Sequence, residues 1–158
     1  MYVPVLVTLC EDSETSNRID GLVALSLCVR RCPSRILKST GIDVVFEKTV
    51  FPSLMFLPSL TPEAESLRIL RPAYVALIQL GVLDLNEDSV PRKGLLDRVL
   101  REGIFAGYAH SNDHIRIVEE LLRISQKLVS KLGINTVKHL GVSCLVLDCV
   151  LSPRFNIS

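Results

Sequence analysis

Two of the three histidines lie close enough in sequence to suggest a shared metal ion. His110 and His114 are four residues apart, with Asp113 beside the second, and on a helix this spacing places two ligands on one face. A helix beginning near Ser111 would leave His110 outside it, however. No third ligand, CxxC or HExxH motif is visible. We therefore expect ordinary surface or half-buried histidines and no bound metal.

Cysteine chemistry is the second possibility, and the chain has five cysteines: Cys10, Cys28, Cys32, Cys144 and Cys149. The odd number and the absence of a disulfide-scaffold spacing predict a reducing compartment. Cys28 and Cys32 are four residues apart in an apolar stretch beside Arg30 and Arg31. A nucleophilic cysteine also needs a base, and none can be assigned. The sequence therefore predicts small core residues at both positions.

Paired carboxylates could serve in acid–base catalysis, and two pairs occur, Glu63 with Glu65 and Glu119 with Glu120. Acids at a helix start and on a solvated helix face explain them better. No glycine-rich phosphate loop and no GxSxG motif is present. The sequence thus predicts neither an enzyme nor a cofactor.

The charge balance argues against nucleic acid and membrane partners. The 158 residues include 18 basic and 17 acidic side chains, for a net charge of +1, which provides no overall field for anionic partners. The one basic cluster is expected to be a solvated helix end, with an acidic-partner or nucleic-acid patch as the alternative; it comprises Arg30, Arg31, Arg35 and Lys38. No apolar run approaches the roughly 20 residues of a membrane span. Aromatic residues make up only 5%, so the core should be aliphatic.

Helical periodicity recurs along the chain, most clearly from about Ser111 to Leu132, with Ser111 as the expected N-cap. Its expected buried stripe consists of Ile115, Val118, Leu121, Leu122, Leu128, Val129 and Leu132. Its expected wet face consists of Arg116, Glu119, Glu120, Arg123, Lys127 and Lys131. A Glu119–Arg123 pair should support the helix from this face.

Further helices are predicted over residues 2–10, 15–32, 42–57, 61–78, 91–102 and 135–151. The second should resume after Pro33 and end at Gly41, and the fifth should extend through Gly103 and Gly107. Thr61 is expected to cap the fourth, Pro62 to occupy its first turn, and Pro72 to kink or divide it.

Grouped as antiparallel pairs, these helices repeat at roughly 45 residues, the period of HEAT and armadillo arrays. The predicted fold is an all-α solenoid of about seven helices in a single domain spanning residues 1–158. Such arrays have polar capping units at their ends. The apolar helices expected at both ends of this chain lack that character, which suggests a fragment of a longer solenoid or docking to a partner.

Several short segments resemble the fungal Tti-type family (Tel-two-interacting protein two), the smallest subunit of the Triple-T co-chaperone complex. They are FE at 46–47, FPSLMFLPSLTPE at 51–63, AYVAL at 73–77, LLDRVLREGI at 95–104 and VKHL at 137–140. Their order and spacing are kept over most of residues 10–150. The motif positions of greatest interest are Pro58, Leu60, Thr61, Pro62, Glu63, Tyr74, Lys138 and His139.

The resemblance implies a non-catalytic adaptor in a trimer with two larger helical-repeat subunits, of which this chain would form a C-terminal part. That complex supports phosphatidylinositol-3-kinase-related kinases together with the ninety-kilodalton heat-shock chaperone. The implied roles are in DNA-damage signalling, growth signalling and telomere maintenance. The implied location is the cytoplasm and nucleus.

Two interpretations of possible contact residues remain open. One face of the last predicted helix should dock a partner or an absent repeat, or else belong to the core: Val142, Leu145, Val146, Cys149 and Val150. The segment Thr61–Glu63 should set the angle between repeats, or else touch a partner. The alternative function is a HEAT or armadillo peptide-binding module of the transport or splicing type. No ladder of Asn, acidic or aromatic residues is repeated along the helices, which favours the adaptor.

Overall fold

The computed structural model describes residues 2–83 and 90–132, and helices without any strand make up the regular structure of these ranges. The all-α prediction is confirmed there. The elements are α1 (Val3–Cys10), α2 (Thr15–Arg31), α3 (Ser34–Ser39), α4 (Ile42–Val50), the 3₁₀-helix η1 (Phe51–Met55), α5 (Glu63–Val82), α6 (Val90–Arg98), the π-helix η2 (Val99–Phe105), α7 (Ala106–Ser111) and α8 (Ile115–Leu132). The predicted helix over 135–151 lies outside the described residues.

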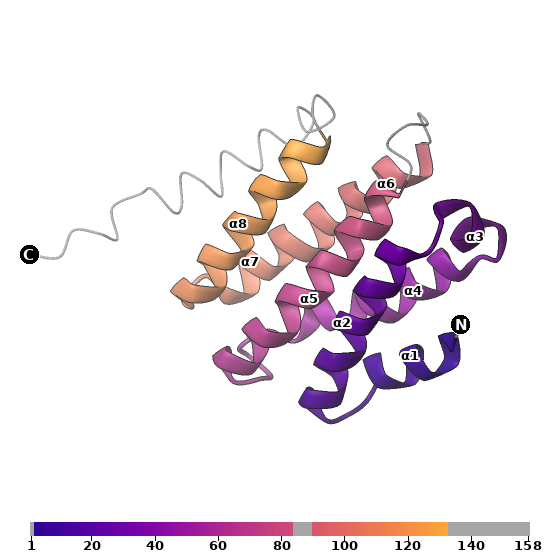
Figure 1. Cartoon of the computed structure of the whole chain (residues 1–158). Helices are drawn as coiled ribbons and strands as arrows, with labels where there is room; N and C mark the ends of the chain where they lie inside the picture. Colours follow the sequence, from indigo (N-terminus) through magenta and orange to yellow (C-terminus); the bar gives the residue numbers. More distant parts are fainter. Residues whose placement is uncertain (1, 84–89, 133–158) are drawn as a thin grey trace, which may run out of the picture.

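The long helices lie side by side (Figure 1). Helix α5 is central, with α2 packed on one side and α8 on the other. Helices α1, α4 and the run from α6 to α7 pack against this row, and α1 and α8 lie at opposite ends of the assembly (Figure 1). A mostly aliphatic core fills the space between the helices, as the sequence predicts, with Tyr74, Phe46 and Phe51 as its aromatic members.

Local backbone features at each end of α2 determine where this helix begins and ends. The backbone N–H of Glu14, the N-cap residue, donates 2.9 Å to Oδ1 of Asp12. At the other end Cys32 is extended with ψ 135°, because the residue before a proline avoids the helical region. The chain then forms the separate helix α3, and Gly41 follows with φ 68°, a conformation that favours glycine. The predicted break at Pro33 and end at Gly41 are confirmed.

The periodicity predicts one α-helix over residues 42–57, but the structure divides this segment into two elements. Helix α4 ends at Val50, and the chain tightens into η1, where Pro52 occupies the first turn. Proline has no N–H to continue the α-helical pattern, which accounts for the change. The apolar residues of this segment lie on two different faces. Phe46, Val50 and Leu54 are buried, whereas Val45 and Met55 are exposed.

The start and middle of α5 depart from expectation. Pro62 is the N-cap residue, and no side chain caps the helix, so the predicted capping role of Thr61 is wrong. The helix also continues through Pro72 as one element, so it is not divided there. Leu70, Ala73 and Tyr74 flank the proline and are at most 1% exposed. Burial on both sides of Pro72 therefore holds the helix together.

Residues 90–111 form a continuous helical run whose middle turn is the π-helix η2. A Cβ added at Gly103 would lie 3.0 Å from Cδ1 of Leu54 and 3.1 Å from Oη of Tyr74, so this glycine permits the close approach of η2 to α5. The run ends at Ser111, which therefore belongs to α7 and does not cap α8. Helix α8 begins at Ile115.

The buried face of α8 is rotated from the predicted one. Ile115 and Val129 are 66% and 40% exposed, whereas Ile117 and Ile124 are buried. Val118, Leu121, Leu128 and Leu132 are buried as predicted. Glu120, predicted to be on the wet face, is only 9% exposed. No helix of the described residues is long and apolar enough to cross a bilayer.

Candidate interaction surfaces

His110 and His114 have different hydrogen-bond partners. His110 lies in α7, and its Nδ1 is 2.7 Å from the carbonyl oxygen of Ala106 in the same helix. His114 instead meets the start of α5, with Nδ1 3.1 Å from Oε2 of Glu63. Within residues 2–83 and 90–132, no group of three or more metal-ligating side chains occurs. His139 lies outside the described residues.

The sequence predicts that Cys28 and Cys32 are core residues, but both are only half-buried. Their sulfur atoms are 3.9 Å apart. Burial, followed by the hydrogen bond with Cys32, raises the pKa of the Cys28 thiol above its ordinary value. A raised pKa lowers the thiolate fraction and opposes nucleophilic catalysis.

The carboxylates join helices and do not pair with each other. Glu63 lies against His114 and Arg116 of the α7–α8 region. Oε2 of Glu65 accepts a 3.3 Å hydrogen bond from Thr15 Oγ1 on α2. Acids at the start of α5 thus connect it to both neighbouring helices, in addition to meeting the positive end of its macrodipole.

The FPSLMFLP segment is a joint between helices. The guanidinium of Arg98, from α6, lies 4.0 Å from the centroid of the Phe51 ring. The guanidinium of Arg18, from α2, lies at the same distance from the Phe56 ring. Each phenylalanine of this segment therefore has its own arginine stacked on it, from α2 or from α6. Both contacts are favourable cation–π arrangements.

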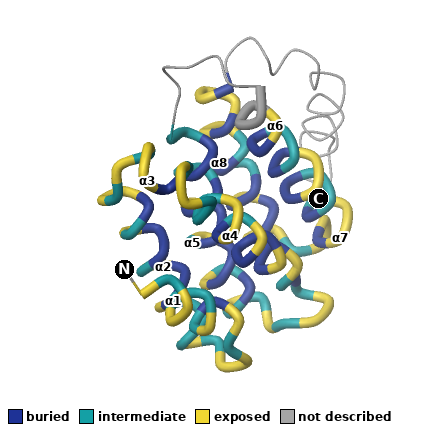
Figure 2. The backbone as a smooth tube through the Cα atoms, turned by 90° about the vertical axis from the view of Figure 1, so that its right-hand side faces the viewer, coloured by how far each residue is buried: buried dark blue, intermediate teal, exposed yellow. Residues whose placement is uncertain are grey.

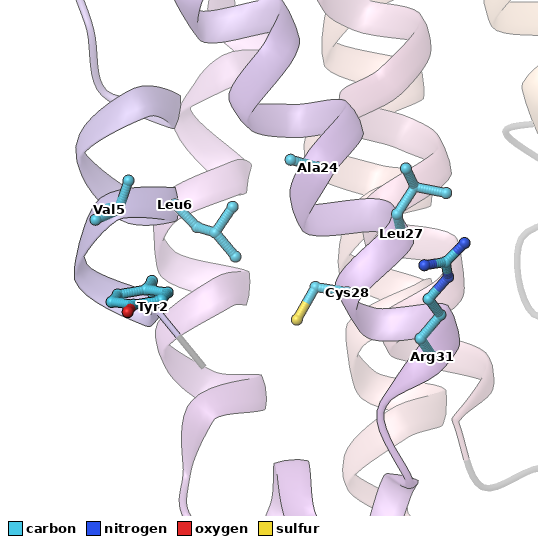
Figure 3. Close-up of a pocket in the computed structure, with 7 residues that line it drawn as sticks. All are labelled: Tyr2, Val5, Leu6, Ala24, Leu27, Cys28 and Arg31. Carbon is cyan, nitrogen blue, oxygen red and sulfur yellow. The ribbon is translucent and has the colours of Figure 1, made fainter.

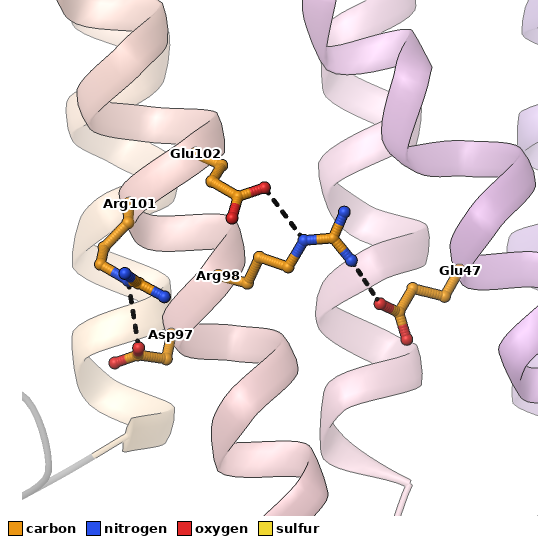
Figure 4. A network of polar contacts seen from close by, with 5 residues as sticks. All are labelled: Glu47, Asp97, Arg98, Arg101 and Glu102. Atoms are coloured by element: carbon orange, nitrogen blue, oxygen red, sulfur yellow. Dashed lines mark hydrogen bonds and ion pairs between the residues drawn. The ribbon is translucent and has the colours of Figure 1, made fainter.

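Arg98 is also the centre of a charged network (Figure 4). Its Nη1 donates to Oε1 of Glu47 on α4 at 3.0 Å, and its Nε donates to Oε2 of Glu102 at 3.0 Å. Arg101 pairs beside it with Asp97 at 3.3 Å. The Arg98–Glu102 spacing is visible in the sequence, but the contact with Glu47, 51 residues away, has no local signal. Sequence reasoning missed this joint.

The remaining motif residues have different environments. Tyr74 is 1% exposed and belongs to the core, where burial raises the pKa of its hydroxyl. Pro58 is half-buried, whereas Leu60 is 84% exposed. Leu60 is thus a large apolar member of this motif that is accessible to a partner, and Pro62 is exposed as well. Lys138 and the predicted docking face at Val142, Leu145, Val146, Cys149 and Val150 lie outside the described residues.

An open groove with a mostly apolar lining lies between α1 and α2 (Figure 3). This α1–α2 groove has a volume of about 330 Å³ and is lined by Tyr2, Val5, Leu6, Ala24, Leu27, Cys28 and Arg31. Tyr2 is 82% and Val5 is 53% exposed. Sequence reasoning identified the apolar character of residues 2–10 but not the α2 residues opposite them. Val23 and Leu27 of α2 are each 45% exposed.

A second groove of about 340 Å³ lies where α2, α5 and α8 approach one another. It is lined by Val29, Arg30, Cys32, Ile78, Gln79, Val82, Leu83 and Lys131. Ser26 Oγ donates 2.8 Å to Oε1 of Gln79 near this contact. Two cationic side chains line this groove, Arg30 from α2 and Lys131 from α8.

Over the described residues, polar side chains tie helices together and do not converge on a reaction centre, an arrangement typical of helical scaffold proteins. The model of the Tti2 family matches residues 1–156, so the chain belongs to the Tti2 family. Members of this family are scaffold-type co-chaperone subunits of the Triple-T complex and are not known as enzymes. The resemblance stated from the short motifs is thereby confirmed. No curated protein and no solved structure gives a significant match to the chain.

Proposed function

We propose that this chain is a non-catalytic adaptor of the Triple-T co-chaperone complex that supports the maturation and stability of phosphatidylinositol-3-kinase-related kinases. The Tti2 family match over residues 1–156 carries this proposal. The partners would be the two larger helical-repeat subunits, with kinase clients and the ninety-kilodalton heat-shock chaperone reached through them. The chain would act in the cytoplasm and nucleus, in DNA-damage signalling and telomere maintenance.

We also propose that the helix pairs are units of one HEAT-like solenoid domain. The pairs are α1 with α2, α4 with α5, and the α6–α7 run with α8. The contacts of α5 with both α2 and α8 support this arrangement, because each unit of a solenoid packs on its neighbours. The polar joints at Glu65 and Arg98 cross between units in this scheme.

Affinity purification of the full chain with mass spectrometry, at physiological salt, tests the adaptor role. Recovery of two large helical-repeat subunits and kinase-related clients would support it. A folded, monomeric chain that recovers neither would contradict it and favour the generic peptide-binding module. A Leu60→Asp variant asks whether the exposed motif residue takes part, with Ile115→Asp as a matched control at a second exposed aliphatic position.

A further inference from the structure

Helix α1 is unusual for its lack of polar surface. Residues Val3–Cys10 read VPVLVTLC and contain no charged side chain. A helix that is apolar on all sides is normally buried on all sides. Yet Cys10 is its only buried residue, and Figure 2 shows the rest of α1 as intermediate or exposed. Among the described helices, the main contacts of α1 are with α2 and α4.

The α1–α2 groove has the form of a seat for another helix. Its α2 side consists of Ala24, Leu27, Cys28 and Arg31, which follow the i, i+3, i+4, i+7 spacing of one helical face. Figure 3 shows Ala24 and Cys28 on the side of α2 that faces Leu6 of α1, and Leu27 and Arg31 further round the same helix. A third helix laid along this gap can place its own side chains between those of α1 and α2. The eight residues of α1 span about 12 Å, which matches roughly two turns of such a helix.

The charge at the groove specifies the partner further. Arg31 is the one charged residue among those that line it. Arg30 precedes it but lines the second groove, and Arg35 follows on α3; all three are exposed. Among the residues that the structure describes, none of the three forms an ion pair. The C-terminal end of α2 favours cations through its macrodipole, but it leaves their hydrogen-bond donors available.

We propose that the α1–α2 groove binds an amphipathic helix of another protein, with apolar side chains between α1 and α2 and acidic side chains against Arg31. This inference assigns a chemistry to one surface and goes beyond the proposed complex. The groove is shallow, and the i, i+3, i+4, i+7 spacing of its α2 side favours the ridge of a helix over the surface of a bilayer. A second copy of the chain is disfavoured because it would bring the same arginines together.

The test is a fluorescence anisotropy titration of the full chain with labelled model helices of about 16 residues, long enough to form helix. One peptide has Leu at i, i+3, i+4 and i+7 and Glu on the flanking positions. A second has Lys in place of Glu, and a third has the Leu positions scrambled. We expect the acidic peptide to bind at least about tenfold tighter than either of the others.

Variants locate the binding. Arg31→Glu should reverse the preference between the Glu and Lys peptides, and Leu27→Asp should abolish binding of both. Ile115→Asp and Lys127→Glu, matched changes on α8, should leave the affinity unchanged. Circular dichroism and urea unfolding establish that each variant is folded. If Leu27→Asp fails to fold, Arg31→Glu alone decides, because Arg31 is exposed.

Equal affinity for the acidic and basic peptides would overturn the proposal, as would binding that Arg31→Glu leaves intact. Absence of saturable binding would also overturn it. Two controls address other occupants: sedimentation with phosphatidylserine vesicles, and the oligomeric state of the chain alone. Vesicle binding or self-association that depends on Leu27 would replace the proposed helix. Recovery of the large subunits from cells is a separate measurement. The helix-binding groove and the adaptor role can therefore fail independently.

Discussion

Arg71 on α5 and Glu120 on α8 form an ion pair of 3.0 Å in which the carboxylate is nearly buried. Arg123 adds a second contact to the same oxygen at 3.3 Å. Glu120 thus faces the α5–α8 contact, where two arginines compensate its lost hydration. Removal of the carboxylate would leave the arginine side chains without this partner.

Glu120→Ala should lower the free energy of unfolding by about 1–3 kcal/mol, because hydrogen bonds to a partly buried charge are lost. Glu119→Ala is the matched control, since Glu119 is exposed and adjacent. It should change the free energy by less than about 0.5 kcal/mol. Urea unfolding followed by circular dichroism measures both. Equal effects of the two substitutions would contradict the burial of Glu120.

The Arg98 joint can be measured by a double-mutant cycle. Arg98→Ala and Glu47→Ala should show a coupling energy of about 0.2–1 kcal/mol, typical of partly exposed pairs. This coupling should shrink as salt is raised. Arg98→Lys should not restore the joint, because lysine cannot contact two carboxylates and stack on Phe51 with one planar group. Additive effects of the two alanine substitutions at low salt would refute the contact.

Two glycines offer opposite outcomes for the same substitution. A Cβ at Gly21 would lie 2.7 Å from the backbone nitrogen of Cys10 and 2.8 Å from the carbonyl carbon of Leu9, and backbone atoms cannot move aside easily. Gly21→Ala should therefore separate α1 from α2 and cost about 1–3 kcal/mol.

Gly94→Ala is the control for that prediction, because a Cβ there meets no atom of the described residues within 4 Å. Gly94 lies within α6, so alanine should raise the free energy of unfolding by about 0.5–1 kcal/mol through its higher helix propensity. Thermal or urea unfolding of both variants shows whether each substitution raises or lowers the free energy of unfolding. Destabilisation by Gly94→Ala, or tolerance of Gly21→Ala, would contradict these contacts.

Cys10 predicts a pH dependence. Burial, with Glu11 nearby, raises the pKa of its thiol from 9.0 to about 11. Between these values the folded chain keeps the proton and the unfolded chain loses it, so the free energy of unfolding should fall as pH rises from 9 to 11. Below pH 9 this thiol contributes no slope. Cys10→Ala should have a smaller fall over the same range, as measured by urea unfolding at each pH. An identical slope in the two proteins would refute a buried, protonated thiol.

Local signals in the sequence were sufficient to place most helices. Helix α2 begins at Thr15 as predicted, and Pro33 with Gly41 marks the following break and stop. These boundaries depend on backbone preferences of single residues, which the sequence displays directly. The acidic first turn of α5 is predicted correctly for the same reason.

The errors occur where distant residues decide the outcome. Glu120 appears polar and solvated until Arg71, 49 positions earlier, is brought against it. Pro72 should interrupt a helix, but core contacts on both sides of it keep α5 continuous. The stacking of Arg18 on Phe56 and Arg98 on Phe51 likewise depends on tertiary packing. No pattern within a short window contains this information.

The single buried residue of α1 has a consequence for the amount of this protein in a cell. An uncharged helix with exposed Tyr2 and Val5 presents the apolar surface that chaperones and proteases use to detect incompletely assembled chains. Molecules that lack whatever covers α1 should be degraded first. We therefore expect the cellular level of this chain to follow the supply of its binding partner more closely than its own rate of synthesis.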